Sequence, residues 1–152
     1  MSTVITATAT VAASPDQVFE LLTDPARHCE FDGTGMVGAP ADPAMLTHIG
    51  QIFVMNMTYR DGDDVEHYQS DNHVCAFEPG RAIAWATAAH GGAPLGWFWR
   101  YDVEPAAGGA AVTLTYDWTN TPPDNVRRFG VPLADAESLT RSLELLFCAC
   151  EA

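Results

Sequence analysis

Apolar residues near the end of the chain recur at three- and four-residue steps. Within residues 132–150 they are Leu139, Leu143, Leu146, Phe147 and Cys150, which fall on one stripe of an α-helix. No Gly or Pro interrupts the range after Pro132, and Asp135 or Pro132 suits the first turn. The pattern predicts one long helix that must bury its stripe against another element.

The beginning of the chain predicts a strand followed by a helix. Val, Thr and Ala alternate over residues 3–13, as is typical of a strand. Ser14 and Gln17 then match a capping box, and Pro15 suits the first helical position. We expect this helix to end at residues 24–25, where Asp precedes Pro.

Residues 26–33 predict a second brief helix, and a glycine-rich passage follows it. Residues 33–40 match neither a dinucleotide-binding loop nor a phosphate-binding loop with its lysine. We interpret this passage as a flexible connector, and we expect no cofactor.

Period-two patterns fill most of the chain between residues 47 and 118. They predict strands at 49–60, 65–78, 82–88, 95–105 and 111–118. The connections are short, which favours antiparallel pairing. Residues 125–130 predict a further short helix before the long terminal one.

Bulky residues gather on one face of these strands. They are Phe53, Met55, Met57, Tyr59, Trp85, Trp97, Trp99, Tyr101, Tyr116 and Trp118. One interpretation is an ordinary core, because such residues usually fill the space under a sheet. The alternative is the wall of a cavity, since Tyr and Trp carry polar tips and Met adapts to irregular shapes. Such a wall suits a flat apolar ligand with a few oxygens.

Composition limits the classes of partner and the compartment. A chain of 152 residues fits one domain over residues 1–152, and 47% apolar residues fit a globular protein. The net charge is −13, with seven Arg and no Lys, which argues against binding nucleic acid or anionic lipid. Without a signal peptide or an apolar run of membrane-spanning length, we expect a cytoplasmic protein with reduced cysteines and no membrane insertion.

No motif in the sequence indicates a metal centre or an activated nucleophile. His67 and His73 would share a strand face with Asp71, but six residues of strand span ~20 Å, which is too far for one ion. We therefore interpret both histidines as surface residues and expect no metal. The nucleophile motif G-x-S-x-G is absent from the sequence.

Several segments together resemble a known superfamily. They are VAASPDQVFELLTDPARHCEFDG, GQIFVMNM, FEPGRAIAW, WRYDVEP and VTLTYDW. In this order they resemble polyketide cyclase/dehydrase-like proteins of the START / Bet v 1-like (SRPBCC) superfamily. The resemblance implies an α+β helix-grip fold: a seven-stranded antiparallel sheet curved around a long C-terminal helix, with two short helices after strand 1. It also implies a deep cavity for lipids, sterols, polyketides or other aromatic molecules.

The preferred hypothesis is a non-covalent binder of a small hydrophobic or aromatic ligand. Its expected ligand-binding residues are Phe53, Met55, Met57, Tyr59, Trp85, Trp97, Trp99, Tyr101, Tyr116, Leu139 and Leu143. The alternative is a cyclase or aromatase acting on a poly-β-ketone, which needs a base and an acid in the pocket. A co-chaperone-like interaction module and a homodimer are further alternatives left open.

Candidate catalytic groups can be named by residue type alone. They are His48, His73, Arg100, Asp102, Tyr101, Tyr59 and Tyr116. Arg100 and Asp102 lie on the strand face opposite the tryptophans, so we expect them to form a surface ion pair. The observation that would favour an enzyme is a His, Asp or Arg inside the cavity beside a Tyr.

Overall fold

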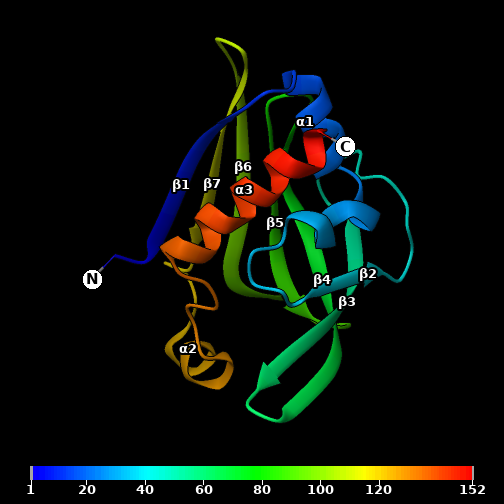
Figure 1. The fold of residues 1–152 in the computed structure, drawn as a ribbon. Helices are drawn as coiled ribbons and strands as arrows, with labels where there is room; N and C mark the ends of the chain where they lie inside the picture. Colours follow the sequence, from blue (N-terminus) through cyan, green and yellow to red (C-terminus); the bar gives the residue numbers. More distant parts are fainter. Residues whose placement is uncertain (1, 152) are drawn as a thin grey trace.

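A curved antiparallel sheet wraps around one long helix in the computed structural model, which describes residues 2–151 (Figure 1). The elements are β1 (Val4–Val11), α1 (Pro15–Leu22), η1 (Pro25–Phe31, a 3-10 helix), β2 (Val37–Pro40), β3 (Ile52–Asp61), β4 (Asp64–Glu78), β5 (Ala82–Ala89), β6 (Pro94–Ala106), β7 (Gly109–Asp117), α2 (Pro123–Phe129) and α3 (Ala136–Glu151). This arrangement confirms the expected helix-grip architecture.

The strand order in the sheet is β1-β7-β6-β5-β4-β3-β2, and every neighbouring pair is antiparallel. From β3 to β7 each strand pairs with the next one along the chain, as the short connections predict. Strand β1 instead pairs with β7, so the first and last strands of the chain lie side by side. The registers place inward-facing residues opposite one another, including Phe53 beside Asn72 and Asn72 beside Thr87.

The glycine-rich passage is not the flexible connector that the sequence suggested, because residues 37–40 form the edge strand β2. The Asp32 carboxylate accepts hydrogen bonds from the backbone N–H of Thr34 (2.9 Å) and of Val37 (2.8 Å), which fixes the loop before the strand. Gly38 lies so close to β3 that an added Cβ would stand 2.8 Å from the Asn56 backbone oxygen. The lack of a side chain at Gly38 therefore allows β2 to approach β3 closely.

Both predicted N-terminal helices form, the first with the capping box that the sequence predicts and the second as the 3-10 helix η1. The Ser14 hydroxyl accepts from the Gln17 N–H, and the Gln17 side chain accepts from the Ser14 N–H, which completes the capping box of α1. Val18 and Leu22 of α1 are fully buried. The short helix predicted at 125–130 is also present, as α2.

Helix α3 begins at Ala136, so of the two residues expected to serve its first turn, Asp135 and Pro132, it is Asp135 that precedes the helix. Asp135 caps it, since its carboxylate accepts from the Ser138 N–H at 2.8 Å. The buried positions of α3 are Leu139, Ser142, Leu143, Leu146 and Ala149, whereas Phe147 and Cys150 of the predicted stripe are half-buried. No helix within residues 2–151 is long and apolar enough to cross a membrane.

Close packing joins the loop after η1 to α3. The Gly33 N–H donates to the Ser142 hydroxyl at 2.8 Å, and a Cβ at Gly33 would collide with the Ser138 backbone oxygen. Only a glycine lets the chain pass this close to the helix. This contact holds η1 over one end of the space between α3 and the sheet.

Candidate functional site: an internal cavity under the long helix

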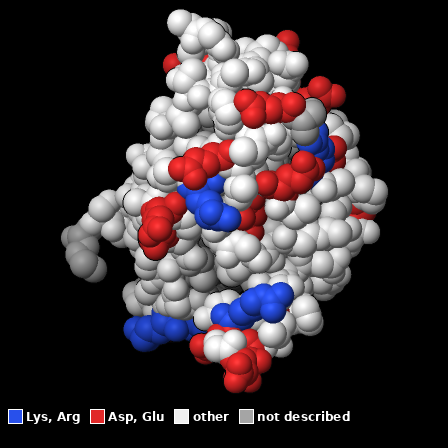
Figure 2. All heavy atoms as spheres, in the orientation of Figure 1, with Lys and Arg blue, Asp and Glu red and all other residues white. Residues whose placement is uncertain are grey.

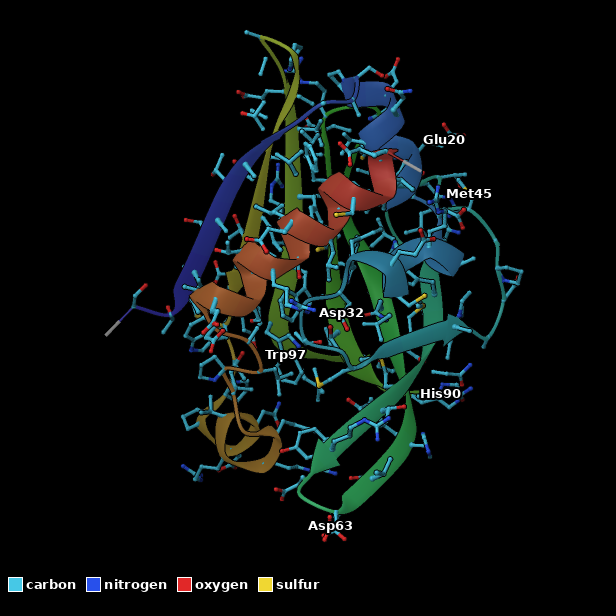
Figure 3. All side chains as sticks on the ribbon, in the orientation of Figure 1. Glu20, Asp32, Met45, Asp63, His90 and Trp97 are labelled. Atoms are coloured by element: carbon cyan, nitrogen blue, oxygen red, sulfur yellow. The ribbon has the colours of Figure 1, made fainter. Side chains whose placement is uncertain are left out.

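A cavity of about 810 Å³ lies between α3 and the inner face of the sheet. Residues of β2 to β7 form the sheet side of the wall, while η1, α2 and α3 contribute to the opposite side. Figure 3 marks Trp97, one of the lining residues, in the space below α3, and Asp63 at the free tip of the β3–β4 hairpin. The volume falls within the range of about 300–1,000 Å³ that small-molecule sites occupy.

The two ends of the cavity differ in exposure. Along β3 the inward-facing residues run from Phe53, 5% exposed, to Tyr59, 46% exposed. Along β4 they run from Asn72, 6% exposed, to Tyr68, 39% exposed. We call the buried end at Phe53 and Asn72 the deep end, and the exposed end at Tyr59 and Tyr68 the mouth.

The deep end is a box of aromatic rings around His28. The imidazole stacks on Trp85, with ring centroids 4.9 Å apart, and meets the edges or tilted faces of Phe31 (5.4 Å) and Phe53 (5.6 Å). Tyr101 joins the same box, 5.9 Å from Trp85 and 6.2 Å from Phe31. These contacts fix the orientation of both polar rings.

The tautomer of His28 follows from its hydrogen bond. The Nε2 atom lies 2.8 Å from the backbone oxygen of Leu22, so Nε2 carries a proton and donates it. Burial lowers the pKa of His28 to about 4, outweighing the Leu22 carbonyl and the charges of Asp24 and Asp32. At neutral pH the ring is therefore uncharged, and its Nδ1 atom is a hydrogen-bond acceptor.

Burial also affects the Tyr101 hydroxyl. It raises the pKa of Tyr101 well above the usual value, with a smaller contribution from the charge of Asp32. The hydroxyl stays protonated at neutral pH and can donate a hydrogen bond. The deep end therefore offers an acceptor and a donor inside an otherwise apolar box.

Polar side chains on β4 and β5 continue along the wall from the deep end. Ser70 and Asn72 are buried and line the cavity, as does the half-buried Thr87. The Asn72 amide donates to the Phe53 backbone oxygen at 3.5 Å, and the Thr87 hydroxyl donates to the Asn72 side-chain oxygen at 3.3 Å. Because both hydrogen bonds are long, the Asn72 amide and the Thr87 hydroxyl can also bond to a ligand.

The mouth carries three charged residues of the cavity wall, whereas a fourth, Asp32, follows η1 near the deep end. Arg127 and Arg128 of α2 lie at the mouth, and so does Glu66 of β4. Arg127 pairs with Asp124 on its own helix, and the Arg128 guanidinium stands 5.1 Å from the centroid of the Phe129 ring. All three charged side chains at the mouth are exposed, so their charges are largely screened by water.

Most residues expected to bind a ligand line this cavity. They are Phe53, Met55, Met57, Tyr59, Trp85, Trp97, Trp99, Tyr101 and Leu139. Tyr116 and Leu143 lie outside the wall. The Tyr116 ring is covered by Trp99, which stacks on it at 4.1 Å, and its hydroxyl accepts from the Leu133 N–H at 3.0 Å. Leu143 is buried within the apolar core that α3 shares with the sheet.

The catalytic candidates chosen by residue type lie mostly elsewhere. His48 is exposed, and its Nδ1 is 2.8 Å from the Thr47 hydroxyl. His73 is absent from the cavity wall, and its buried Nε2 has no hydrogen-bond partner within residues 2–151. Arg100 and Asp102 form the expected ion pair, 3.0 Å apart, away from the cavity. Tyr59 and Tyr101 alone of the set line the cavity.

His28, the one histidine of the cavity wall within residues 2–151, was not predicted from the sequence. The sequence holds only a weak signal for this role. His28 lies three residues before Phe31 on the brief helix predicted at 26–33, so the two side chains share a face of that helix. Other lining residues that were not predicted include the polar Asp32, Ser70, Asn72, Thr87, Ser138 and Ser142.

Several solved structures are similar to this chain over nearly their whole length. Protein CV1439 from Chromobacterium violaceum has a TM-score of 0.69 at 14% identity, with 99% of each chain covered. The Polyketide_cyc-like protein Cgl2372 from Corynebacterium glutamicum has 0.64 at 19%, over 99% of this chain and 93% of that one. The Zhui aromatase/cyclase from Streptomyces sp. R1128 has 0.62 at 15%, over 97% and 93%.

The chain therefore has the same helix-grip fold as these solved structures. No family model and no curated protein matches the sequence. Identities of this size establish the fold alone, and an activity must be argued from the cavity itself.

Proposed function

We propose that the protein binds a small apolar or aromatic molecule in the cavity under α3. The observation that carries this proposal is a space of about 810 Å³ that remains open although aromatic and Met side chains crowd its wall. Burying ~300 Å² of apolar ligand surface contributes about 7 kcal/mol before the costs of association. This is enough for micromolar binding where those costs are small.

The test combines two measurements on the full chain. Native mass spectrometry of gently purified protein is expected to show a one-to-one adduct with a co-purified or added apolar molecule. A thermal shift screen is expected to raise Tm for neutral aromatic compounds, since a ligand that binds only the folded state stabilises it. Absence of any adduct and of any shift across a screen of drug-sized aromatics would contradict the proposal.

A second candidate function is an enzyme of the cyclase or aromatase kind, favoured by His28 beside Tyr101 in the deep end. Cyclisation of a polyketone needs a base to remove an activated proton and a donor to hold the carbonyl. His28 Nδ1 suits the first role and the Tyr101 hydroxyl the second. Mass spectrometry of a synthetic polyketone thioester incubated with the protein tests it, the expected product being smaller by one water. An unchanged thioester would leave binding as the function.

A further inference from the structure

The His28 ring has one nitrogen without a protein partner. Nε2 is committed to the Leu22 carbonyl, whereas Nδ1 makes no hydrogen bond within residues 2–151. Across that same part of the chain, the buried polar side-chain atoms that lack a partner and are sealed from solvent are His73 Nε2, Trp97 Nε1 and Thr121 Oγ1. His28 Nδ1 is not one of them, so it faces open space, and the cavity is the space that His28 lines.

The Tyr101 hydroxyl is likewise a polar group without a protein partner that faces the cavity. It has no hydrogen-bond partner within residues 2–151, and it is not sealed. Because Tyr101 and His28 both contact the rings of Phe31 and Trp85, they lie on the same short stretch of wall. Two buried polar groups without partners cost free energy unless a ligand or water satisfies them.

We propose that the deep end recognises a neutral hydroxyl on an aromatic ring, whose O–H donates to His28 Nδ1 and whose oxygen accepts from the Tyr101 hydroxyl. This inference rests on the proposed function and specifies its ligand class: phenols and enols of flat aromatic molecules, which enter hydroxyl first. The flanking rings of Phe53 and Trp85 supply the stacking surface for the rest of the molecule.

Charge favours a neutral hydroxyl over an anionic group. Within the aromatic box, an ionised ligand would lose its hydration without meeting a cation, because His28 is neutral and the arginines lie at the mouth. The chain also carries a net charge of −13, and acidic side chains outnumber basic ones on the face that carries α3 (Figure 2). An anion would be repelled on approach as well.

A matched pair of ligands isolates the hydroxyl proton. β-Naphthol can donate a hydrogen bond, whereas its methyl ether has the same rings and can only accept one. By calorimetric titration, the unmodified protein is expected to bind β-naphthol about tenfold more tightly or better, as expected for one buried hydrogen bond lost without replacement. Unsubstituted naphthalene, which has no oxygen, is expected to bind no better than the ether.

Three variants assign the contacts. His28→Phe keeps a ring on Trp85 but removes the acceptor, so β-naphthol and the ether should bind equally, with the ether within about twofold of its original affinity. Tyr101→Phe removes a donor that serves both ligands and should weaken both. The control His67→Gln changes an exposed histidine outside the cavity wall and should alter neither.

NMR of the imidazole nitrogens gives a readout that needs no variant. Addition of β-naphthol should shift the resonance of His28 Nδ1 and leave that of Nε2 nearly in place. Equal affinities for β-naphthol and its ether in the unmodified protein, or a preference that survives His28→Phe, would overturn the inference while leaving the proposed function intact. Failure of all three naphthalenes to bind would also overturn the inference, whereas only the absence of binding across the wider screen of aromatics would overturn the proposed function.

Discussion

The deep end and the mouth of the cavity are built from the same strands, yet they are different environments. On β3, Phe53 and Tyr59 point to the same face, but Phe53 is 5% exposed and Tyr59 is 46% exposed. The residues around Phe53 lie under η1, which the contact between Gly33 and α3 holds in place. Strand alternation therefore decides which side chains face inward, while the helices decide which of them are shielded from water.

The difference in shielding changes what polar groups can do. At the deep end His28 is neutral, because burial lowers its pKa to about 4, and its hydrogen bonds are strong in a medium of low polarity. At the mouth Glu66, Arg127 and Arg128 are exposed, and water competes for each of them. We therefore expect ligand selectivity to arise at the deep end and the mouth to serve mainly as an entrance.

The largest expected effect comes from filling the cavity. Thr87→Trp places a large ring beside Asn72 at the deep end and should weaken binding of a neutral naphthalene probe at least ~100-fold, since the new ring would occupy the space in which the probe packs. The control Thr115→Trp adds the same ring on β7, at a position that does not line the cavity, and should bind normally. Titration calorimetry on both variants measures the difference.

The next effect is the pH dependence of stability that His28 causes. As pH falls below about 6.5, the unfolded chain protonates His28 while the folded chain does not, so the free energy of unfolding decreases. The decrease levels off once pH passes the folded-state pKa of about 4 and amounts to about 3 kcal/mol. Urea unfolding of the unmodified protein and of His28→Phe across this window should show the steeper slope in the unmodified protein. Identical slopes would mean that His28 is not buried.

A smaller effect, on stability, is expected where the loop after η1 contacts α3 at Gly33. Gly33→Ala would force its Cβ against the Ser138 backbone oxygen, so we expect a loss of about 1–3 kcal/mol in the free energy of unfolding. Gly35→Ala is the matched control. Gly35 has φ +74° and open space around it, so this change should cost about 1 kcal/mol through backbone strain alone. A smaller loss at Gly33 than at Gly35 would show that the loop is free to move away from the helix.

The smallest effect is expected at the mouth. Arg128→Gln removes the contact of its guanidinium with the Phe129 ring and should lower the free energy of unfolding by about 0.5 kcal/mol. The affinity for a neutral naphthalene should change less than ~twofold, because the exposed charge contributes little to an apolar ligand. Arg141→Gln, at an exposed position on α3, removes the same charge away from the mouth. Comparing the ligand affinities of the two variants by calorimetry separates an effect of the mouth from an effect of net charge.

Local patterns in the sequence were sufficient to predict much of the wall. Alternation on β3 and β6 identified Met55, Met57, Trp97 and Trp99 as inward-facing, and the opposite phase predicted the surface pair of Arg100 and Asp102. The capping box at Ser14 predicted α1. Each of these features depends on residues close together in the chain.

Features that depend on distant contacts were not predictable in the same way. Strand β2 exists because Asp32 orders its loop and Gly38 fits against β3, neither of which periodicity reveals. His28 belongs to the site because Trp85 and Phe53, far along the chain, surround it. Tyr116 has the right strand phase but is covered by Trp99, so the phase alone does not identify the residues that reach the cavity.

The position of a bound ligand tests the central claim most directly. Intermolecular NOEs between β-naphthol and the methyl groups of the protein report that position. We expect NOEs to Met55 and Leu139, which are buried and line the cavity. NOEs confined to Ile49 and Ile52, which are 61% and 52% exposed and do not line it, would place the ligand on the surface and contradict the account.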